Sequence, residues 1–327
     1  MDTALESVIT VKYIYITYRL QMMKNKFSLK YKPRFHSSVG RFLDLLSYIF
    51  TYPWIVSTSL TVSTFLSLSP DQRTVWRYTI DKALLGPALL IISLSLTPFA
   101  VFGFCLWIFI CTFLPSDQFS SVVLSNEVEK DQENYSFGTM NVLLGQEALG
   151  KFNNASLVYR RIQKIAAAIL AQDQRHLTNL KDRNDDNTKI SKTETVLANF
   201  PRMDFICMQE VFDRVHALAL ISMLRNEYKY FTFDIGDSSI KSNYFLLNSG
   251  LMIASRFPIL SVRFHPFTWK NTFWQRCLSY GVVICKVDLG SGNVGIIANL
   301  HTMAYEDQDP LIDTALTEVR QALDQFR

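Results

Sequence analysis

One carboxylate stands where an apolar stretch of the sequence ends. Asp204 to Met208 predicts a short buried strand, and Gln209 and Glu210 follow it directly. Such a strand brings the Glu210 carboxylate to the edge of a sheet, where oxygen ligands can hold a hard cation. A Gln-Glu pair after an arbitrary strand is more often an exposed acidic turn, so the surrounding sequence has to decide between the two interpretations.

Three further polar residues stand near the ends of expected strands. Asn141 lies in the stretch 137–144, Asn248 opens an Asn-Ser-Gly-Leu stretch, and His301 stands two residues after the expected strand 294–299. A strand-end asparagine is usually a turn former, and an isolated histidine is usually a surface or capping residue. None of the three indicates a catalytic site by itself.

Taken together, three stretches resemble the metal-dependent phosphodiesterases of the DNase I-like (endonuclease/exonuclease/phosphatase) superfamily. They are Met-Gln-Glu-Val-Phe-Asp at 208–213, Leu-Asn-Ser-Gly-Leu at 247–251 and Ala-Ser-Arg-Phe-Pro at 254–258. Within that superfamily the region from about Phe137 to Arg327 is most similar to the membrane-anchored neutral sphingomyelinases of vertebrates. The resemblance implies a DNase I-like four-layer α/β sandwich that hydrolyses sphingomyelin to ceramide and phosphocholine.

The resemblance also implies roles for the four polar residues. Glu210 would bind Mg²⁺, Asn141 would donate to the phosphate, and Asn248 would orient the site. His301 would donate to a phosphate oxygen, although an ungapped alignment places it one position off the sphingomyelinase pattern.

Two departures from the family pattern affect the expected activity. Tyr280 and Gln275 stand where the sphingomyelinases have a lysine and an acidic partner, and the later Gly-Asp-x-Asn and Ser-Asp-His blocks have no counterpart before Arg327. Those blocks supply an aspartate and a histidine base, and such groups contribute orders of magnitude in rate. We therefore expect an incomplete, C-terminally truncated domain with impaired turnover. A membrane-tethered pseudoenzyme that binds lipid without turnover is the alternative.

The N-terminal third of the chain predicts a membrane anchor. Residues 1–41 form a basic arm with eight Lys or Arg and two acidic residues, about +6 (8 − 2), which suits anionic phospholipids. Residues 42–114 contain two hydrophobic segments, and 83–114 carry no charge over more than the ~20 residues that span a bilayer. Proline can break a helix, and these segments contain Pro53, Pro87 and Pro98. Each segment could therefore be a membrane span or a re-entrant hairpin.

The remaining chain predicts a linker and a mixed α/β domain. Residues 115–136 are polar and acidic, and 137–327 hold the partial catalytic domain with a polar insertion at 172–195. Helices are expected at 157–170, 212–225 and 310–326, and strands at 228–234, 246–255, 280–287 and 294–299.

The expected location is a Golgi, plasma or other intracellular membrane, with the catalytic domain facing the cytosol. A nuclease of the same fold is a further alternative, but nucleic acid needs no membrane anchor, so no nucleic-acid partner is expected. Five cysteines without zinc-site spacing argue against a structural zinc site.

Overall fold

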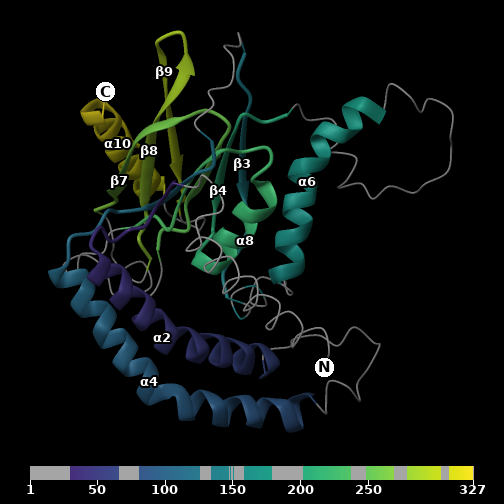
Figure 1. Ribbon diagram of the computed structural model, residues 1–327, viewed down its shortest axis with the longest axis vertical. Coiled ribbons are helices and arrows are strands. Elements are labelled where there is room, and N and C mark those ends of the chain that lie inside the picture. Colours follow the sequence, from purple (N-terminus) through teal and green to yellow (C-terminus); the bar gives the residue numbers. More distant parts are fainter. Residues whose placement is uncertain are drawn as a thin grey trace.

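Two β-sheets packed face to face form the centre of the protein (Figure 1). The computed structural model describes residues 30–65, 81–125, 134–146, 148, 150, 158–178, 202–236, 248–268, 278–302 and 309–326. The six-stranded sheet has the order β1-β2-β5-β6-β4-β3 and the three-stranded sheet the order β7-β8-β9. The strands are β1 (Lys30–Lys32), β2 (Ser120–Val123), β3 (Phe137–Asn141), β4 (Phe205–Gln209), β5 (Tyr230–Phe233), β6 (Met252–Ser255), β7 (Ile259–Pro266), β8 (Gly281–Gly290) and β9 (Asn293–Leu300).

Helices cover the outer faces of the two sheets. Helices α6 (Val158–Thr178) and α8 (Arg214–Leu224) pack on the six-stranded sheet, and α10 (Asp309–Phe326) packs on the three-stranded sheet. A third apolar cluster fills the space between the sheets. The order helix, sheet, sheet, helix is the four-layer α/β sandwich that the sequence predicted.

The strand pairing determines which strand ends meet. β3 and β4 are parallel, with Asn141 opposite Gln209, whereas β6 runs antiparallel to β4 and pairs Met252 with Met208. The carboxyl ends of β3 and β4 therefore lie together, beside the start of β6. β9 crosses β4 from the other sheet and brings its own carboxyl end to the same place.

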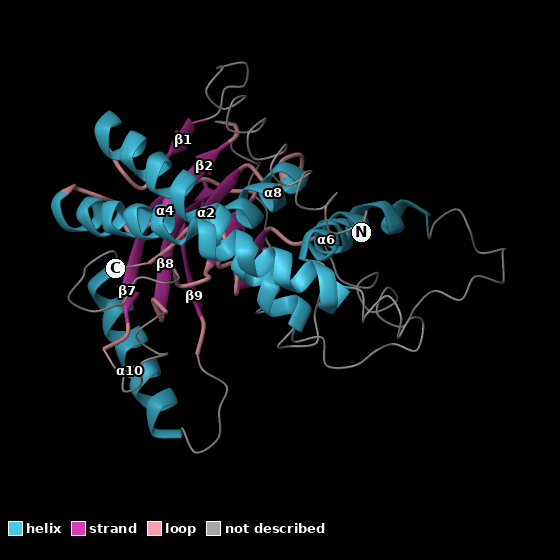
Figure 2. Cartoon of the chain, turned by 90° about the horizontal axis from the view of Figure 1, so that it is seen from below, coloured by secondary structure: helices cyan, strands magenta, loops and turns pink. Residues whose placement is uncertain are grey.

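Two long helices form an antiparallel hairpin below the sandwich (Figures 1 and 2). Helix α2 (Ser38–Phe65) leads to a short π-helix η1 (Asp81–Leu85) and to helix α4 (Gly86–Phe113). Pro87 lies in the first turn of α4, where a missing N–H costs nothing, and Pro53 and Pro98 lie inside the helices. Both helices are long and apolar enough to cross a membrane.

The ends of this hairpin belong to the sandwich. Strand β1 precedes α2, strand β2 follows α4, and the two strands pair with each other before β2 pairs with β5. Part of the predicted basic arm and part of the predicted linker thus extend the six-stranded sheet. β1 is exposed along its whole length and β2 begins with two serines, so neither strand shows the apolar run that predicts a buried strand.

One predicted helix is longer than expected, and several other predicted features lie outside the described residues. Helix α6 continues to Thr178, into the polar insertion predicted at 172–195, and 179–195 lie outside the described residues. Residues 1–29 of the basic arm and Gln275 also lie outside them. Strand β7, which the sequence did not predict, forms an edge of the three-stranded sheet.

Candidate active site

The Asn141, Glu210 and His301 side chains meet at one end of the sandwich. Asn141 ends β3, Glu210 directly follows β4, and His301 directly follows β9. The Asn141 Nδ2 donates to Glu210 Oε1 at 2.6 Å, and the His301 Nε2 lies 3.4 Å from the same oxygen. The parallel pairing of β3 with β4 and the crossing of β9 over β4 bring together three residues that are far apart in the chain.

The Glu210 backbone adopts a conformation that side chains rarely take. Its φ is +64°, and its carbonyl accepts a hydrogen bond from the Leu144 amide at 2.7 Å. The Val211 amide donates to the Gly250 carbonyl at 2.8 Å. Left-handed backbone at a residue with a long side chain is uncommon and is concentrated at functional sites.

Gly250 allows the Asn-Ser-Gly stretch to pass close behind Glu210. Its φ is +69°, and a Cβ there would lie 2.7 Å from the Phe212 ring and 3.1 Å from the Glu210 Cα. Asn248 holds the same turn, because its Oδ1 accepts from the Gly250 amide and its Nδ2 donates to Asp234. These hydrogen bonds of Asn248 thus go to the supporting turn rather than to Asn141, Glu210 or His301.

Hydrogen bonding keeps the Glu210 carboxylate charged. The His301 hydrogen bond is the largest cause that lowers the Glu210 pKa; burial acts in the opposite direction, and the Asn141 hydrogen bond lowers the pKa further. Favouring the ionised form in this way is the expected effect of donors around a carboxylate. Glu210 is therefore an anion at neutral pH.

The geometry fits a cation that needs a single protein carboxylate. Both described side-chain contacts of Glu210 use Oε1, so Oε2 keeps its lone pairs, and the side chain retains 18 % of its exposure. In the described part of the chain, no group of three or more His, Cys, Asp or Glu residues could hold a metal ion. Mg²⁺ keeps several of its waters and is commonly held by one or two carboxylates, so this site suits it better than a metal that needs an all-protein shell.

Comparison with known proteins shows the family of this chain. Residues 138–325 match the Endonuclease/Exonuclease/phosphatase family. The chain belongs to this family. It is 34% identical over 140 residues to sphingomyelin phosphodiesterase 3 of Rattus norvegicus, covering 40% of this chain and 21% of that protein. It is 31% identical over 134 residues to sphingomyelin phosphodiesterase 5 of Mus musculus, covering 40% of this chain and 28% of that protein.

The matches thus span less than a third of these relatives' own length. Among solved structures, a β-hairpin deletion mutant of beta toxin from Staphylococcus aureus is similar, with a TM-score of 0.39 and 16% identity over 60% of this chain and 63% of that chain.

This family member places an aromatic ring beside His301. The Tyr280 and His301 rings lie 5.9 Å apart between centroids, and Tyr280 is buried. Tyr280 stands where the resemblance leads one to expect a lysine. A neutral ring therefore lies beside the histidine, in place of the cation that the resemblance implies.

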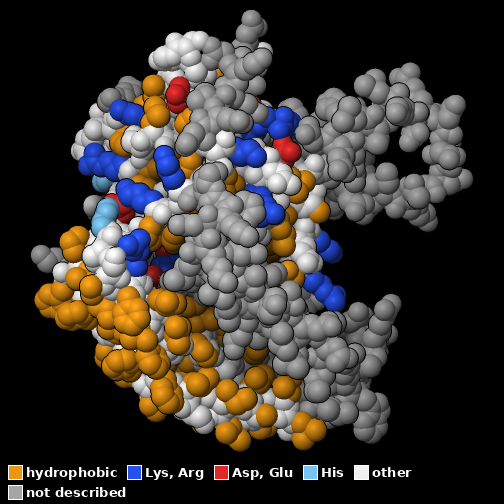
Figure 3. All heavy atoms as spheres, in the orientation of Figure 1, with side chains coloured by type: hydrophobic (Ala, Val, Ile, Leu, Met, Phe, Trp, Pro, Cys, Tyr) orange, Lys and Arg blue, Asp and Glu red, His pale blue; other side chains and the backbone are white. Residues whose placement is uncertain are grey.

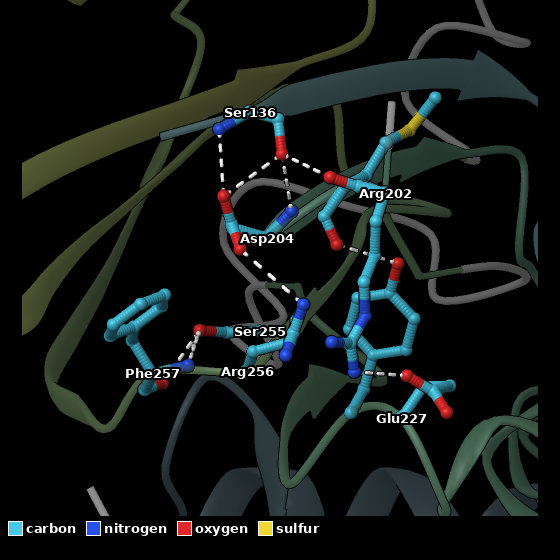
Figure 4. A network of polar contacts seen from close by, with 9 residues as sticks. Ser136, Arg202, Asp204, Glu227, Ser255, Arg256 and Phe257 are labelled. Atoms are coloured by element: carbon cyan, nitrogen blue, oxygen red, sulfur yellow. Dashed lines mark hydrogen bonds and ion pairs between the residues drawn. The ribbon is translucent and has the colours of Figure 1, made fainter. Parts of the chain in front are cut away.

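The Ser-Arg-Phe stretch that supported the family resemblance has a structural role at the opposite end of the strands (Figure 4). The Ser255 hydroxyl donates to the Phe257 carbonyl and accepts from the Phe257 amide, which fixes a turn. Arg256 lies 3.6 Å from Asp204, whose carboxylate also accepts from the Ser136 amide and hydroxyl. These contacts hold the starts of β3 and β4 together, away from Glu210.

The helical hairpin contacts the site end of the sandwich. The Ala148 amide, in the segment after β3, donates to Ser59 Oγ of α2 at 3.0 Å. Arg214, at the start of α8, lies 2.8 Å from Asp44 of α2 and 2.8 Å from Asp234, the acceptor for Asn248. The hairpin and the site are thus neighbours, linked by direct polar contacts.

The sequence did not predict several residues that support the site. Gln209 and Asn299 lie between the two sheets, and Asp234 and Arg214 connect the site to α2. Asn299 could have been found from the sequence, because an amide within an otherwise apolar strand such as β9 is expected to form hydrogen bonds inside the core. The ion pairs could not be read from the sequence, because Asp44 and Arg214 are distant in the chain.

Proposed function

We propose that this family member hydrolyses the phosphodiester bond of a membrane lipid, sphingomyelin, in an Mg²⁺-dependent reaction at the bilayer surface. The observation that carries the proposal is the position of the site: Asn141, Glu210 and His301 lie at the end of the sandwich that faces the apolar hairpin. A water-soluble substrate would not need that proximity. The sphingomyelin phosphodiesterase relatives support the choice of lipid.

The hairpin supports embedding in lipid by the pattern of its burial. The buried residues of α2 are small or polar, whereas large apolar side chains point outward from both helices. The space-filling view shows this apolar surface gathered at the hairpin end of the molecule (Figure 3). The outward residues of α4 include Leu90, Ile91, Ile92, Leu94, Phe99, Val101, Phe102, Ile108, Phe109 and Phe113. In water such a surface would be a liability, but lipid is a good solvent for it.

The dimensions of the hairpin also suit a bilayer. Each helix has 28 residues, which corresponds to about 42 Å at the α-helical rise, more than the ~30 Å of the hydrocarbon core. Both ends of the hairpin enter the same sheet through β1 and β2. We infer that both ends lie on one side of the membrane, and we assign that side to the cytosol.

The catalytic roles follow from what each side chain offers. A bound Mg²⁺ would neutralise phosphate charge and polarise the phosphoryl group. Glu210 would hold that ion through Oε2. Asn141 and His301 would keep the Glu210 carboxylate ionised and fix its orientation. The Asn141 amide and the His301 ring also lie within reach of a phosphate bound beside Glu210, and Asn248 would steady the turn behind it.

A second candidate function is lipid binding without turnover. Tyr280 favours it, because a neutral ring beside His301 does not supply the positive charge that a lysine would. In this alternative Glu210 and Asn141 would bind the head group and the metal, and the hairpin would keep the domain at the membrane.

We also propose that basic residues near the hairpin bind anionic lipid head groups and not nucleic acid. Lys30, at the start of β1, and Arg41, in the first turn of α2, are exposed. Lys32 instead pairs with Asp117 at 2.7 Å, and buried Arg34 donates to the Gly236 carbonyl. Both side chains are thus already engaged by groups of the protein itself. Basic groups beside an apolar anchor are suited to an anionic leaflet.

Phosphocholine release from sphingomyelin vesicles, with the full chain in the same membrane, tests the function. Glu210→Gln removes the anionic ligand without changing its shape, so we expect activity to fall by about 10³-fold or more. Glu227→Gln is the matched control, because Glu227 pairs with Arg202 near the opposite end of the strands, and it should retain activity. Removal of Mg²⁺ with a chelator should abolish turnover in the parent chain.

Calorimetry with Mg²⁺ separates the two candidate functions. Turnover that requires Glu210 supports the hydrolase. Mg²⁺ binding that requires Glu210, without any phosphocholine release, supports the second candidate. A parent chain that folds, enters the membrane and binds no Mg²⁺ would overturn the metal site altogether.

A further inference from the structure

Two buried amide side chains link the sheets at the site end of the sandwich. Gln209 ends β4 and is 9 % exposed, and Asn299, on β9, is 2 % exposed. The Gln209 Nε2 donates to Asn299 Oδ1 at 2.7 Å. The apolar cluster between the sheets includes the buried residues Phe205, Ile253, Val283, Cys285, Val287 and Ile297.

The Asn299 side chain forms hydrogen bonds with the backbone of two strands in the opposite sheet. Its Nδ2 donates to the Met208 carbonyl and to the Met252 carbonyl, each at 3.1 Å. Met208 and Met252 are register partners in β4 and β6. Both amide protons and the carbonyl of Asn299 are therefore used, and each contact crosses from one sheet to the other.

Gln209 joins the three strands that carry the candidate site residues. Besides Asn299 on β9, its Nε2 donates to Thr139 Oγ1 on β3 at 3.1 Å. Beyond these points, β3 ends at Asn141, β4 leads to Glu210, and β9 leads to His301. One amide group thus contacts all three strands next to the places where their functional side chains begin.

The cost of burying these amides indicates that their role is positional. A buried amide is unfavourable unless it is hydrogen-bonded, and a non-directional apolar side chain could fill the same space without that requirement. Apolar packing, however, is non-directional and does not select particular partner atoms across the two sheets. Directional hydrogen bonds set a single register between the ends of β4 and β9.

We propose that Gln209 and Asn299 form an inter-sheet clamp that positions Glu210 relative to Asn141 and His301, and that thereby sets the affinity of Glu210 for a divalent cation. The second half of this proposal rests on the proposed function. Both residues act through Glu210 and are positioning residues rather than catalytic ones.

The experiment uses the full chain in lipid nanodiscs and four variants. Gln209→Leu and Asn299→Leu each remove one half of the clamp, and Gln209→Asn combined with Asn299→Gln exchanges the two amides while conserving their summed length. Ser255→Ala is the control, because it removes buried hydrogen bonds at the far end of β6. Mg²⁺ affinity is measured by calorimetry.

Hydrogen exchange provides a second readout that needs no metal. The Val142, Leu144 and Val211 amides donate to the carbonyls of Gln209, Glu210 and Gly250, so their protection reports the order of the Glu210 turn. In the Ser255→Ala control the Phe257 amide should lose protection instead.

Each single leucine variant should bind Mg²⁺ about 10- to 100-fold more weakly, the usual effect of removing outer-shell support. The three site amides should exchange faster, and the exchanged-amide variant should recover most of the affinity and protection. Single variants with unchanged affinity and protection, or an exchanged-amide variant no better than the singles, would overturn the clamp. If the parent chain binds no Mg²⁺, the proposed function fails, and the exchange data alone decide whether the clamp exists.

Discussion

The hairpin and the sandwich have opposite distributions of polar and apolar side chains. In α2 the buried residues are Gly40, Asp44, Ser47, Thr51, Ser57, Ser59, Thr61 and Ser63, and the exposed residues of α4 are mostly Leu, Ile, Val and Phe. In the sandwich, Phe, Ile, Val and Leu fill three buried clusters. The sandwich thus buries its large apolar side chains, whereas the hairpin exposes them.

The packing of each region is the one expected if the sandwich lies in water and the hairpin, as proposed, in lipid. In water, burial of apolar area stabilises the sandwich, so large side chains go inside. Lipid gives no such driving force between helices, so close packing and interhelical hydrogen bonds take its place. At Gly103 the two helices are in close contact, because a Cβ there would lie 2.7 Å from Thr51 and 2.9 Å from Phe50 of the other helix.

The junction between the two regions should give the largest effect. Arg214→Met would leave the Asp44 and Asp234 carboxylates without their shared cation in a mostly buried place. Breaking a buried pair in this way costs about 3–5 kcal/mol, which thermal unfolding in nanodiscs would measure. Arg202→Met is the control: its partner Glu227 is more exposed, so the cost should stay below about 1 kcal/mol. Equal losses in the two variants would contradict a buried junction.

A lysine placed on the outer face of each region tests whether that face contacts lipid or water. Val101 on α4 is 55% exposed and Val294 on β9 is 53% exposed, so the pair is matched in residue type and exposure. Val101→Lys should oppose membrane insertion by about 2.5–3.5 kcal/mol, whereas Val294→Lys should change stability by less than about 0.5 kcal/mol. Carbonate extraction and vesicle flotation give the measurement. Similar behaviour of the two variants would mean that α4 does not face lipid.

The smallest effect concerns buried serines. Ser93 of α4 donates to Ser57 of α2 at 3.0 Å, and Ser93→Ala should cost about 0.6 kcal/mol, typical of polar contacts between membrane helices. Ser255→Ala in the sandwich removes two hydrogen bonds to Phe257 and should cost about 1 kcal/mol. Thermal unfolding of both variants under one condition gives the comparison. A much larger loss at Ser93 would make hydrogen bonding, rather than close packing, the main source of hairpin stability.

The sequence by itself determined the classes of structure and several candidate site residues. Residues 83–114 are apolar, uncharged and longer than a bilayer span, which predicted a hydrophobic segment, and helix α4 occupies most of it. Strong periodicity predicted α6, α8 and α10, and apolar runs followed by Gln-Glu and by His predicted the ends of β4 and β9. Glu210, His301 and Asn141 were all proposed from these patterns together with the family resemblance, and the structure brings them together.

The tertiary structure decided what lies beside these residues. The strands β1 and β2 lack an apolar run, and only their pairing shows that the hairpin starts and ends in the sheet. The bond from Gln209 to Asn299 and the ion pair of Asp44 with Arg214 join residues that are 90 and 170 positions apart. Local sequence specifies backbone preference and the direction of burial, but contacts between distant residues depend on how the sheets and helices pack.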